Sequence, residues 1–500
     1  MAGTEHVISM EESLSRKVSF VREEAGETSR RRQSIEIEEE ASSTSKIRKA
    51  NLEKLKEAGP KITRNPDDPK TTPKIQEVPA LLRGHKNFQK YFEPRVVSLG
   101  PIHHGKKEYQ AAEDFKLGMA CKFVEDSGKS GEVLHGKIAE NIEQLKQYFD
   151  EKVAEKYDDE TLAWMLFVDG CAVLQSIHSV VHEEIIKKLK IKNDQMAFAQ
   201  QDLFLLENQL PYQLLLVLMD SSAKKEDLKE SIETFMSRMA HERGRIYVGK
   251  AGETNGTPIH LLYLLRTKLV GKSTTENKGR SNGLINFFKK VMTIFADLIP
   301  CKSKSGGEQE QSFRNVQELR AAGIYVKPAQ TSLLTKISFD RSLKFFAGYL
   351  QLPLITVDDA TGPKFFNLIA YEMCSDFDND YGITSYVAFL DSLIDNPGDV
   401  KELRNAGILY NLLGSDEEVA QLFNEIGTDL VPDSAAYGDV KKKIQSHYRN
   451  QLKVWIAQAI HEHFSSPWTI LAFIAAILGL GLSAVQAFYA VKGDESKKQK

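Results

Sequence analysis

Apolar residues recur at intervals of three and four along most of the chain between residues 110 and 463, which is the spacing of one face of an α-helix. The chain is therefore expected to be mainly helical. Before residue 271 the pattern predicts helices over 110–126, 132–155, 160–190, 200–219 and 225–240. Farther along it predicts helices over 383–395, 415–426 and about 435–463, with one more in GPKFFNLIAYEMCS.

A few short strands are expected where β-branched and aromatic residues lie between turn residues. Residues 92–99 are one candidate, entered through Pro94 and ended by Gly100 and Pro101. The segments LLTKISFD and KFFAGYLQLPLITVDD supply others. The predicted fold class is mainly α with a few short β-strands (α+β), and a C-terminal transmembrane helix is added below.

The string ELRAAGI at 318–324 is echoed by ELRNAGI at 402–408. Two matches of seven residues are too short to establish a repeat. Each has the form of a helix end followed by glycine and an apolar residue, so Gly323 and Gly407 are expected to adopt the left-handed conformation after a helix.

The longest apolar run lies near the C-terminus, where residues 468–491 (WTILAFIAAILGLGLSAVQAFYAV) contain no charged residue. A helix of this length would be about 36 Å long, enough to cross a hydrocarbon core of about 30 Å. Trp468 at one end and Phe488 and Tyr489 at the other stand where aromatic side chains meet the membrane–water interface. One transmembrane helix is therefore predicted over 468–491, followed by a basic tail over 492–500.

The orientation of this anchor has two readings. The lysines of the tail KGDESKKQK favour a cytoplasmic tail and an external body. The N-terminal sequence MAGTEHVISMEESLSRKVSF, however, has no uninterrupted apolar stretch of the kind a secretory signal contains. We favour a tail anchor in the plasma membrane or an endomembrane, with a cytosolic body. Ala475, Gly479 and Ser483 place small residues on one helix face, which allows a homodimer.

Two polar regions flank or interrupt the predicted body. Residues 1–74 are rich in Ser, Glu, Lys and Arg, and this composition predicts a disordered tail. Residues 271–312 predict a mobile insertion with one short amphipathic helix over 284–298, which either packs on the body or lies in a membrane plane. The body then consists of a helical first part over 75–270 and a second part over 313–464.

Composition excludes some classes of function. The net charge of the 500 residues is −3, so no overall basic field favours nucleic acid. The four cysteines, Cys121, Cys171, Cys301 and Cys374, are far apart, which fits reduced thiols better than a zinc module or a disulfide framework.

The candidate catalytic residues are four. His103 and His104 in GPIHHG can act as acid, base or ligand near neutral pH. Asp169 in VDGC and Glu207 in LENQ have apolar neighbours, and such surroundings can raise the pKa of a carboxyl group. The same side chains can instead tie turns and helix ends together inside the core. We favour this structural role.

Metal and nucleotide sites have weaker support. His178 and His182 are four residues apart on an expected helix and could ligate zinc, but no third ligand follows at a typical spacing. The string VGKST at 270–274 resembles half of a phosphate-binding loop, yet Arg266 stands where its first glycine is required. No metal or cofactor is predicted.

Several strings together resemble the plant domain of unknown function 247 family. They are VPALLRGHKNFQKYFEPRVVSLGPIHHG, MLFVDGCAVL, DLFLLENQLPYQLL, PIHLLYLLR, ELRAAGI, LPLITVDDATGPKFFNLIAYE, ITSYVAFLDSLI, LLGSDEEVAQLFN and the SSPW before the apolar run. The resemblance covers residues 75–491. It implies a plant protein with a mainly helical domain, a C-terminal anchor and no established enzymatic activity. Some grass members of the family are implicated as pollen-side determinants of self-incompatibility, which implies recognition of a protein partner.

The functional expectation is therefore a membrane-anchored plant protein that acts through protein–protein interaction or recognition, in signalling or a self-incompatibility-like process. The alternative is a membrane-bound enzyme of unknown reaction that uses the His103/His104 region. The expected partners are a membrane and an unidentified protein, and nucleic acid is not among them.

Overall fold

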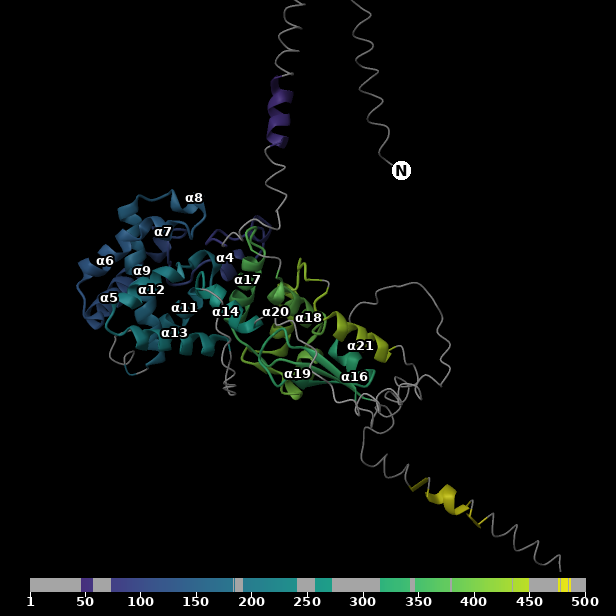
Figure 1. Ribbon diagram of the computed structural model, residues 1–500. Helices are drawn as coiled ribbons and strands as arrows, with labels where there is room; N and C mark the ends of the chain where they lie inside the picture. Colours follow the sequence, from purple (N-terminus) through teal and green to yellow (C-terminus); the bar gives the residue numbers. More distant parts are fainter. Residues whose placement is uncertain are drawn as a thin grey trace, which may run out of the picture. The chain divides into compact units, whose positions relative to one another are not determined.

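Figure 1 shows the computed structural model of the chain. The structure describes residues 46–56, 73–182, 184, 192–240, 257–271, 315–341, 347–377, 380–433, 435–448 and short pieces between 475 and 486. The expected insertion after Gly271, the tail 492–500 and the expected interfacial residues Trp468, Phe488 and Tyr489 lie outside the described residues. The chain divides into two compact units, Met1–Thr71 and Thr72–Lys500.

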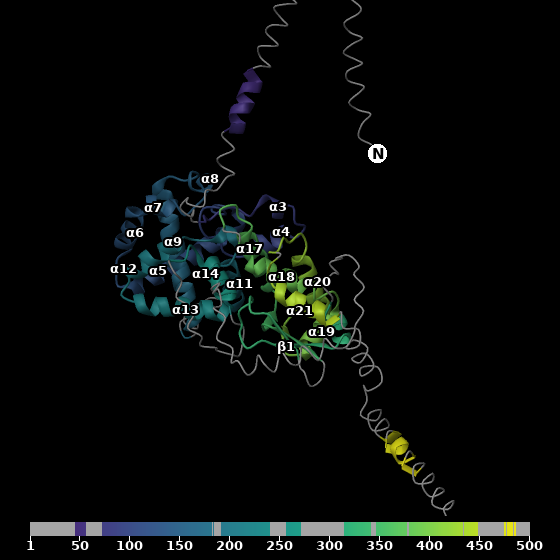
Figure 2. The ribbon, with the colours of Figure 1, turned by 45° about the vertical axis from the view of Figure 1, so that its right-hand side comes forward.

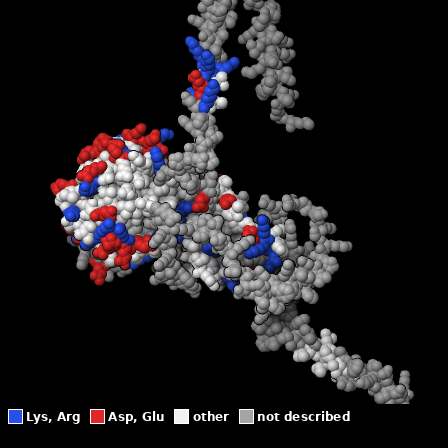
Figure 3. Space-filling view, in the orientation of Figure 1, with Lys and Arg blue, Asp and Glu red and all other residues white. Residues whose placement is uncertain are grey.

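In the first unit the structure describes a helix over residues 46–56, within the segment for which composition predicts disorder. Its sequence, KIRKANLEKLK, is rich in lysine, and Figure 3 shows these basic side chains in blue. The apolar side chains of Ile47, Leu52 and Leu55 are exposed on it. The N-terminal segment thus contains a basic helix with an unburied apolar surface.

Helices dominate the second unit. Before residue 272 they are α3 (Ala80–Arg83), α4 (Phe88–Phe92), η1 (Lys107–Tyr109), α5 (Gln110–Ser127), α6 (Gly131–Glu140), α7 (Ile142–Lys146), α8 (Glu151–Ala154), α9 (Asp159–Val181), α11 (Asn193–Asp202), η2 (Leu206–Asn208), α12 (Tyr212–Ser221), α13 (Lys225–Ala240) and α14 (Leu261–Val270). The central helix is α9, against which α5, α6, α12 and α13 pack.

Two features explain why α9 forms and where it lies. The side chain of Asp158 caps its first turn by accepting a hydrogen bond from the N–H of Thr161 at 2.9 Å. Its 23 residues are then apolar enough to cross a membrane, but 78% of its most apolar window is buried inside the protein. Among the described residues it is the one helix with this length and composition. It is the core helix of the body.

The predicted helices over 110–126 and 225–240 are confirmed as α5 and α13. Two of the longer predicted helices are divided into shorter ones in the structure. The prediction over 132–155 corresponds to α6, α7 and α8. The break before α8 has a local cause, because Ile75 forms a β-bridge with Phe149. The N–H of Ile75 donates to the carbonyl of Tyr148, and its carbonyl accepts from the N–H of Asp150. The carbonyl of Tyr148 and the N–H of Asp150 therefore bond to Ile75 and are not available for a continuous helix.

The other two long predictions are met in part. The prediction over 160–190 is met by α9 as far as Val181, and residues 183 and 185–190 of it lie outside the described residues. The prediction over 200–219 is divided among the end of α11, the short η2 and α12. Pro211 immediately precedes α12, close to the helix start that its fixed φ predicts.

The second part of the body mixes helices with short strands. Its elements are α16 (Val316–Ala321), β1 (Ile324–Pro328), β2 (Ser338–Arg341), β3 (Gly348–Leu352), β4 (Ile355–Val357), α17 (Thr361–Glu372), α18 (Gly382–Asp391), α19 (Pro397–Asn405), β5 (Leu409–Asn411), α20 (Asp416–Ile426) and α21 (Gly438–Tyr448). The three-stranded sheet has the order β1-β3-β2, with β1 parallel and β2 antiparallel to β3. A second sheet pairs β4 with β5 in parallel. The predicted class, mainly helical with a few short strands, is confirmed.

The two echoed strings have the same local structure. Each ends a helix, α16 or α19, and leads directly toward a strand, β1 or β5. Gly323 and Gly407 have φ values of 78° and 70°, so the prediction of left-handed glycines is confirmed. The two helices pack together, and Arg320 of the first string forms an ion pair with Glu402 of the second.

The two parts of the body share one hydrophobic core. A single cluster of buried side chains includes Phe92 and Leu265 from the first part and Tyr371 and Phe389 from the second. The contacts of α17 with α4 and of α14 with α18 join the parts, and Figure 2 shows the green α17 and α18 beside teal α14. Side chains from both sides of the 271–312 segment are therefore needed to complete the core.

Candidate functional site

The segment between α4 and η1 carries both candidate histidines and is extended without being a strand. The prediction of a strand over residues 92–99 is wrong, because α4 ends at Phe92 and no described strand pairs with the residues after it. Side chains supply the hydrogen bonds that a strand partner would have given. The protein needs such partners here, because an unpaired buried N–H or C=O group costs about 1–3 kcal/mol.

Asp202, the last residue of α11, holds the start of this segment. Its carboxylate oxygens accept hydrogen bonds from the N–H groups of Arg95 (2.9 Å), Val96 (2.8 Å) and Val97 (2.9 Å). Burial raises the pKa of the Asp202 carboxyl more than these N–H groups lower it. One carboxylate thus accepts from three consecutive N–H groups at a bend of the chain.

Asn208, in η2, holds the middle of the segment. Its Oδ1 accepts from the N–H of Leu99 at 2.6 Å, and its Nδ2 donates to the carbonyls of Val97 (3.0 Å) and Asp202 (2.9 Å). The next residue, Gln209, is used in the same way, since its Nε2 donates to the carbonyl of Leu205 at 2.7 Å. The buried polar residues of LENQ therefore serve the backbone.

Asp169, on α9, holds the end of the segment together with a buried lysine. Its Oδ2 accepts from the N–H of Gly100 at 2.8 Å, and its Oδ1 lies 2.7 Å from Nζ of Lys116 on α5. The same ammonium lies 2.9 Å from Glu113 and donates to the carbonyl of Ser98 at 3.0 Å. Burial lowers the pKa of Lys116, but the two carboxylates more than offset this and raise it. Lys116 is therefore a buried cation that links α5, α9 and the extended segment.

Gly100 ends the segment in a conformation that favours glycine. Its φ is 67°, and a Cβ atom there would lie 3.2 Å from the carbonyl oxygen of Gln209. The chain then turns through Pro101 and Ile102 to present His103 inward. The glycine of GPIHHG is thus fixed by backbone geometry and close packing.

Glu207 and His103 form a second buried pair. The Nε2 of His103 lies 3.1 Å from Oε2 of Glu207, and Nζ of Lys106 lies 2.8 Å from Nδ1 of the same ring. Because an ammonium group only donates, Nδ1 accepts and Nε2 carries the ring proton toward Glu207. The other oxygen of Glu207 accepts from the N–H of Val78 (2.7 Å) and from Arg83 (2.9 Å).

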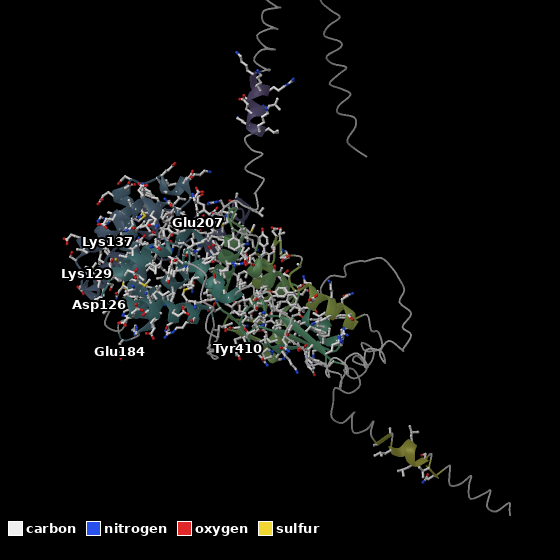
Figure 4. All side chains as sticks on the ribbon, viewed as in Figure 1. Asp126, Lys129, Lys137, Glu184, Glu207 and Tyr410 are labelled. Atoms are coloured by element: carbon white, nitrogen blue, oxygen red, sulfur yellow. The ribbon has the colours of Figure 1, made fainter. Side chains whose placement is uncertain are left out.

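These partners determine the charge state of Glu207. Burial raises the pKa of its carboxyl, but the hydrogen bond from His103, the Val78 N–H and the Arg83 charge together lower it below its usual value. Figure 4 shows Glu207 toward the middle of the body, whereas Asp126, Lys129 and Lys137 lie at its outer surface. Glu207 is an ionised acceptor that joins the segment before α3 to the GPIHHG turn.

His104 points elsewhere. Its ring lies 5.8 Å from the ring of Tyr157, whose hydroxyl donates to the carbonyl of Pro101 at 3.2 Å. The structure thus brings His103 and Glu207 together and places Asp169 against Gly100 and Lys116, while His104 packs on a tyrosine. The four candidates do not meet around a common cavity.

The weak metal candidates, His178 and His182, are close but engaged otherwise. Their ring centroids are 4.5 Å apart, and Nδ1 of His178 lies 2.9 Å from the hydroxyl of Ser231 on α13. Burial lowers the pKa of His178. Within the described ranges, no group of three or more His, Cys, Asp or Glu side chains is arranged to hold a metal ion.

Sequence reasoning missed Lys116 and Asp202, which hold the extended segment as firmly as the candidates do. A signal for Lys116 existed, because it occupies the buried stripe of α5 with Ala112, Met119 and Phe123. A lysine at an apolar helical position requires a buried acceptor nearby. Its acceptor, Asp169, is 53 residues away and could not be assigned from spacing.

The comparisons with known proteins agree with the resemblance. The family model of DUF247, described as a plant protein of unknown function, matches residues 75–482. This chain belongs to that family. The DUF247 chain is also 25% identical to the UPF0481 protein At3g47200 of Arabidopsis thaliana over 426 residues, which covers 80% of this chain and 83% of the relative. The putative UPF0481 protein At3g02645 of the same plant is 24% identical over 504 residues, covering 83% and 90%. No solved structure matches significantly.

The bounds of the DUF247 match coincide with features of the structure. It begins at Ile75, the residue that bridges to Phe149, and it includes every element of the body from α3 to α21. It also continues into the apolar stretch that starts at residue 468. The family's common unit is therefore the complete shared core together with the start of the C-terminal segment.

Proposed function

We propose that this DUF247 protein is anchored in a membrane by residues 468–491 and that its cytosolic body binds a protein partner. The observation that carries the anchor is a helix over residues 478–483 on which Leu478, Leu480 and Leu482 are 62%, 72% and 65% exposed. Alternate residues point to different sides of a helix, so apolar surface surrounds this one. Such a surface is unfavourable in water and favourable in lipid.

A hydrogen bond in the same helix supports this assignment. The hydroxyl of Ser483 donates to the carbonyl of Gly479 at 2.9 Å. Inside a bilayer a polar group must find its partner within the protein, and this bond provides one for the hydroxyl. A serine in the predicted span is therefore compatible with lipid.

The topology can be tested by protease protection. We expect an epitope tag at the N-terminus to be digested on sealed microsomes without detergent, because the proposed body faces the cytosol. The membrane fraction should also retain the protein after alkaline carbonate washing. A tag that survives until detergent is added would place the body on the other side and refute the cytosolic orientation.

Two truncations provide the control for anchoring. Removing residues 468–500 is expected to release the protein from carbonate-washed membranes. Removing residues 1–71, the separate N-terminal unit, should leave it bound. Retention of the first truncated protein in the pellet would show that the C-terminal segment is not the anchor.

The body has an exposed aromatic position suited to recognition. Trp164 on the core helix α9 is 53% exposed, and its ring centroid lies 5.9 Å from that of His135 and 5.8 Å from that of Phe167. Val133, on the adjacent α6, is also exposed. Exposed tryptophans supported by neighbouring rings are typical of binding hot spots.

Charges around Trp164 indicate what the partner presents. The first residues of α9 include the acidic Asp159 and Glu160, and Glu160 lies 3.9 Å from Nε2 of His135. Figure 3 shows acidic side chains gathered along the edge of the first part near α8. The proposed partner surface therefore has an apolar side chain flanked by lysine or arginine.

The geometry of the candidate residues favours recognition over the enzymatic alternative. His103, Asp169 and Glu207 are buried, and Asp169 and Glu207 each accept hydrogen bonds from a backbone N–H group and a charged side chain. Reacting groups need access to substrate, which these side chains lack in the structure.

The variant Trp164→Ala tests the recognition surface. Proximity biotinylation in plant cells labels the proteins that lie close to the wild-type protein. We expect the variant to label the partner at least tenfold less, because truncation of a hot-spot residue costs about 2 kcal/mol or more. Tyr410→Ala is the matched control, since Tyr410 is 54% exposed on β5 in the second part. An unchanged set of labelled proteins with Trp164→Ala, or an equal loss with Tyr410→Ala, would refute this surface.

A further inference from the structure

Four helices of the first part, α5, α9, α11 and α13, surround a cavity that none of the candidate site residues uses. The space among its lining atoms, with the part open to solvent included, is about 390 Å³. Its wall is mostly apolar and includes Phe115, Ala172, Ile177, Met196 and Phe235. Figure 1 shows the four helices in blue to teal in the first part of the body. Pockets for small molecules in proteins have this apolar character.

Three polar side chains, Lys116, Ser176 and Gln200, also line the cavity. The ammonium of Lys116 has three donors, and they are directed to Asp169 (2.7 Å), Glu113 (2.9 Å) and the carbonyl of Ser98 (3.0 Å). Only its methylene stem is therefore left to contact a ligand. Ser176 and Gln200 remain as neutral hydrogen-bonding groups.

The charges beside the cavity discriminate between ligand classes. One ammonium, Lys116, faces two acidic side chains, Asp169 and Glu113, so no positive charge is left over beside the cavity. An anionic head group would find no free cation among the described lining residues. A neutral group with one hydroxyl or carbonyl could bond to the amide of Gln200 or the hydroxyl of Ser176.

We propose that this cavity binds a neutral, largely apolar small molecule that carries a single hydroxyl or carbonyl group. The apolar body contacts α5, α9 and α13, and the polar group reaches Gln200 on α11 or Ser176 on α9. This inference does not depend on the membrane anchor or on the protein partner.

The packing of α11 explains how a ligand is accommodated. In the described shape the cavity leaves little room beyond that of a water-sized sphere, so its wall must move outward. Met196 of α11 packs with Met119 and Ala172 in a small cluster separate from the main core. Methionine adapts readily to a changed shape, so the wall can move at Met196, while Ala199 and Leu203 keep the other end of α11 in the main core.

Two leucine substitutions on α11 test the proposal. Ala199 lines the cavity and is buried, whereas Ala197 is exposed on the same helix. The probe is the neutral ketone dye 6-propionyl-2-dimethylaminonaphthalene, added to the full-length protein in nanodiscs, with empty nanodiscs as the background. We expect Ala199→Leu to weaken saturable binding of the dye at least tenfold, because the new side chain occupies the cavity. Ala197→Leu should bind like the wild type.

The ligand class is tested with a charged dye and a polar variant. The sulfonate dye 1-anilinonaphthalene-8-sulfonate is expected to bind at least tenfold more weakly than the ketone dye. Gln200→Leu should reduce binding of the ketone dye several-fold, with a circular dichroism spectrum like that of the wild type. This variant provides the test if Ala199→Leu fails to fold. Wild-type ketone binding by a folded Ala199→Leu protein, or equal binding of the two dyes at the site that Ala199→Leu blocks, would overturn the proposal.

Discussion

Replacing Arg266 with methionine is expected to lower the free energy of unfolding by about 3–5 kcal/mol, because it leaves a carboxylate buried without its cation. Arg266 on α14 donates from Nε to Oε1 of Glu372 on α17 at 2.8 Å, and its Nη2 lies 2.7 Å from the same oxygen. Glu372 also accepts from the N–H groups of Ile383 and Thr384, both at 2.9 Å, at the start of α18. The pair thus joins the first part of the body to two helices of the second.

The surroundings of Glu372 make it sensitive to this loss. Burial already raises the pKa of its carboxyl more than Arg266 lowers it. Without the guanidinium, the charged form is less stable still, and the carboxyl must either be protonated or draw water into the core. Stability should therefore be measured at pH 7, where an unpaired carboxylate is most costly.

An exposed pair serves as the matched control. Arg320 and Glu402 also join two helices, but Arg320 is at the surface, so Arg320→Met should cost less than about 1 kcal/mol. Urea unfolding of both variants gives the comparison. The double variant Arg266→Met, Glu372→Gln should recover part of the loss, because the remaining amide is neutral. Equal losses for the two arginine variants would show that burial does not determine the strength of the Arg266 pair.

The sequence predicts those parts of the fold that local physics determines. Gly323 and Gly407 are recognisable because a helix that ends in the left-handed conformation favours glycine, whatever the rest of the chain does. The apolar stripe of α5 has the same local origin, since spacing alone places one face inward. The strand prediction over residues 92–99 is wrong because β-branched and aromatic residues between turn residues favour a strand but do not identify its hydrogen-bonding partner. Here the partners are side chains rather than a strand.

The candidate site was predictable only to the level of residue type. Glu207 and Asp169 stand in apolar sequence, so burial and the need for hydrogen bonds follow. Their particular partners do not follow, because His103 and Lys116 reach them through tertiary packing across long stretches of chain. A sequence that shows buried polar residues therefore predicts a network, and only the structure shows whether the network faces a substrate or the backbone.

A second buried group, His260, has consequences for acid stability. It caps α14, with its Nδ1 accepting from the N–H of Tyr263 at 3.1 Å, and its ring lies 5.0 Å from that of Tyr371. The ring is fully buried, and its Nε2 has no hydrogen-bond partner among the described residues. Burial lowers the pKa of His260 from 6.5 to about 3. The folded protein thus keeps a neutral imidazole where the unfolded chain is protonated.

Acidification from pH 7 to pH 5 is therefore expected to destabilise the protein through His260. The stability associated with its lowered pKa is complete above 6.5, and it decreases as pH falls from 6.5 toward 3, by about 1.4 kcal/mol per pH unit. His260→Asn keeps a capping acceptor but does not titrate, so it should remove about 2 kcal/mol of the loss measured by urea unfolding between pH 7 and pH 5. His182→Asn, at an exposed position, controls for the number of histidines and should keep the part of the loss that His260→Asn removes. If His260→Asn loses stability as steeply as the wild type, another group determines the acid response, and the imidazole of His260 takes up its proton without unfolding the core.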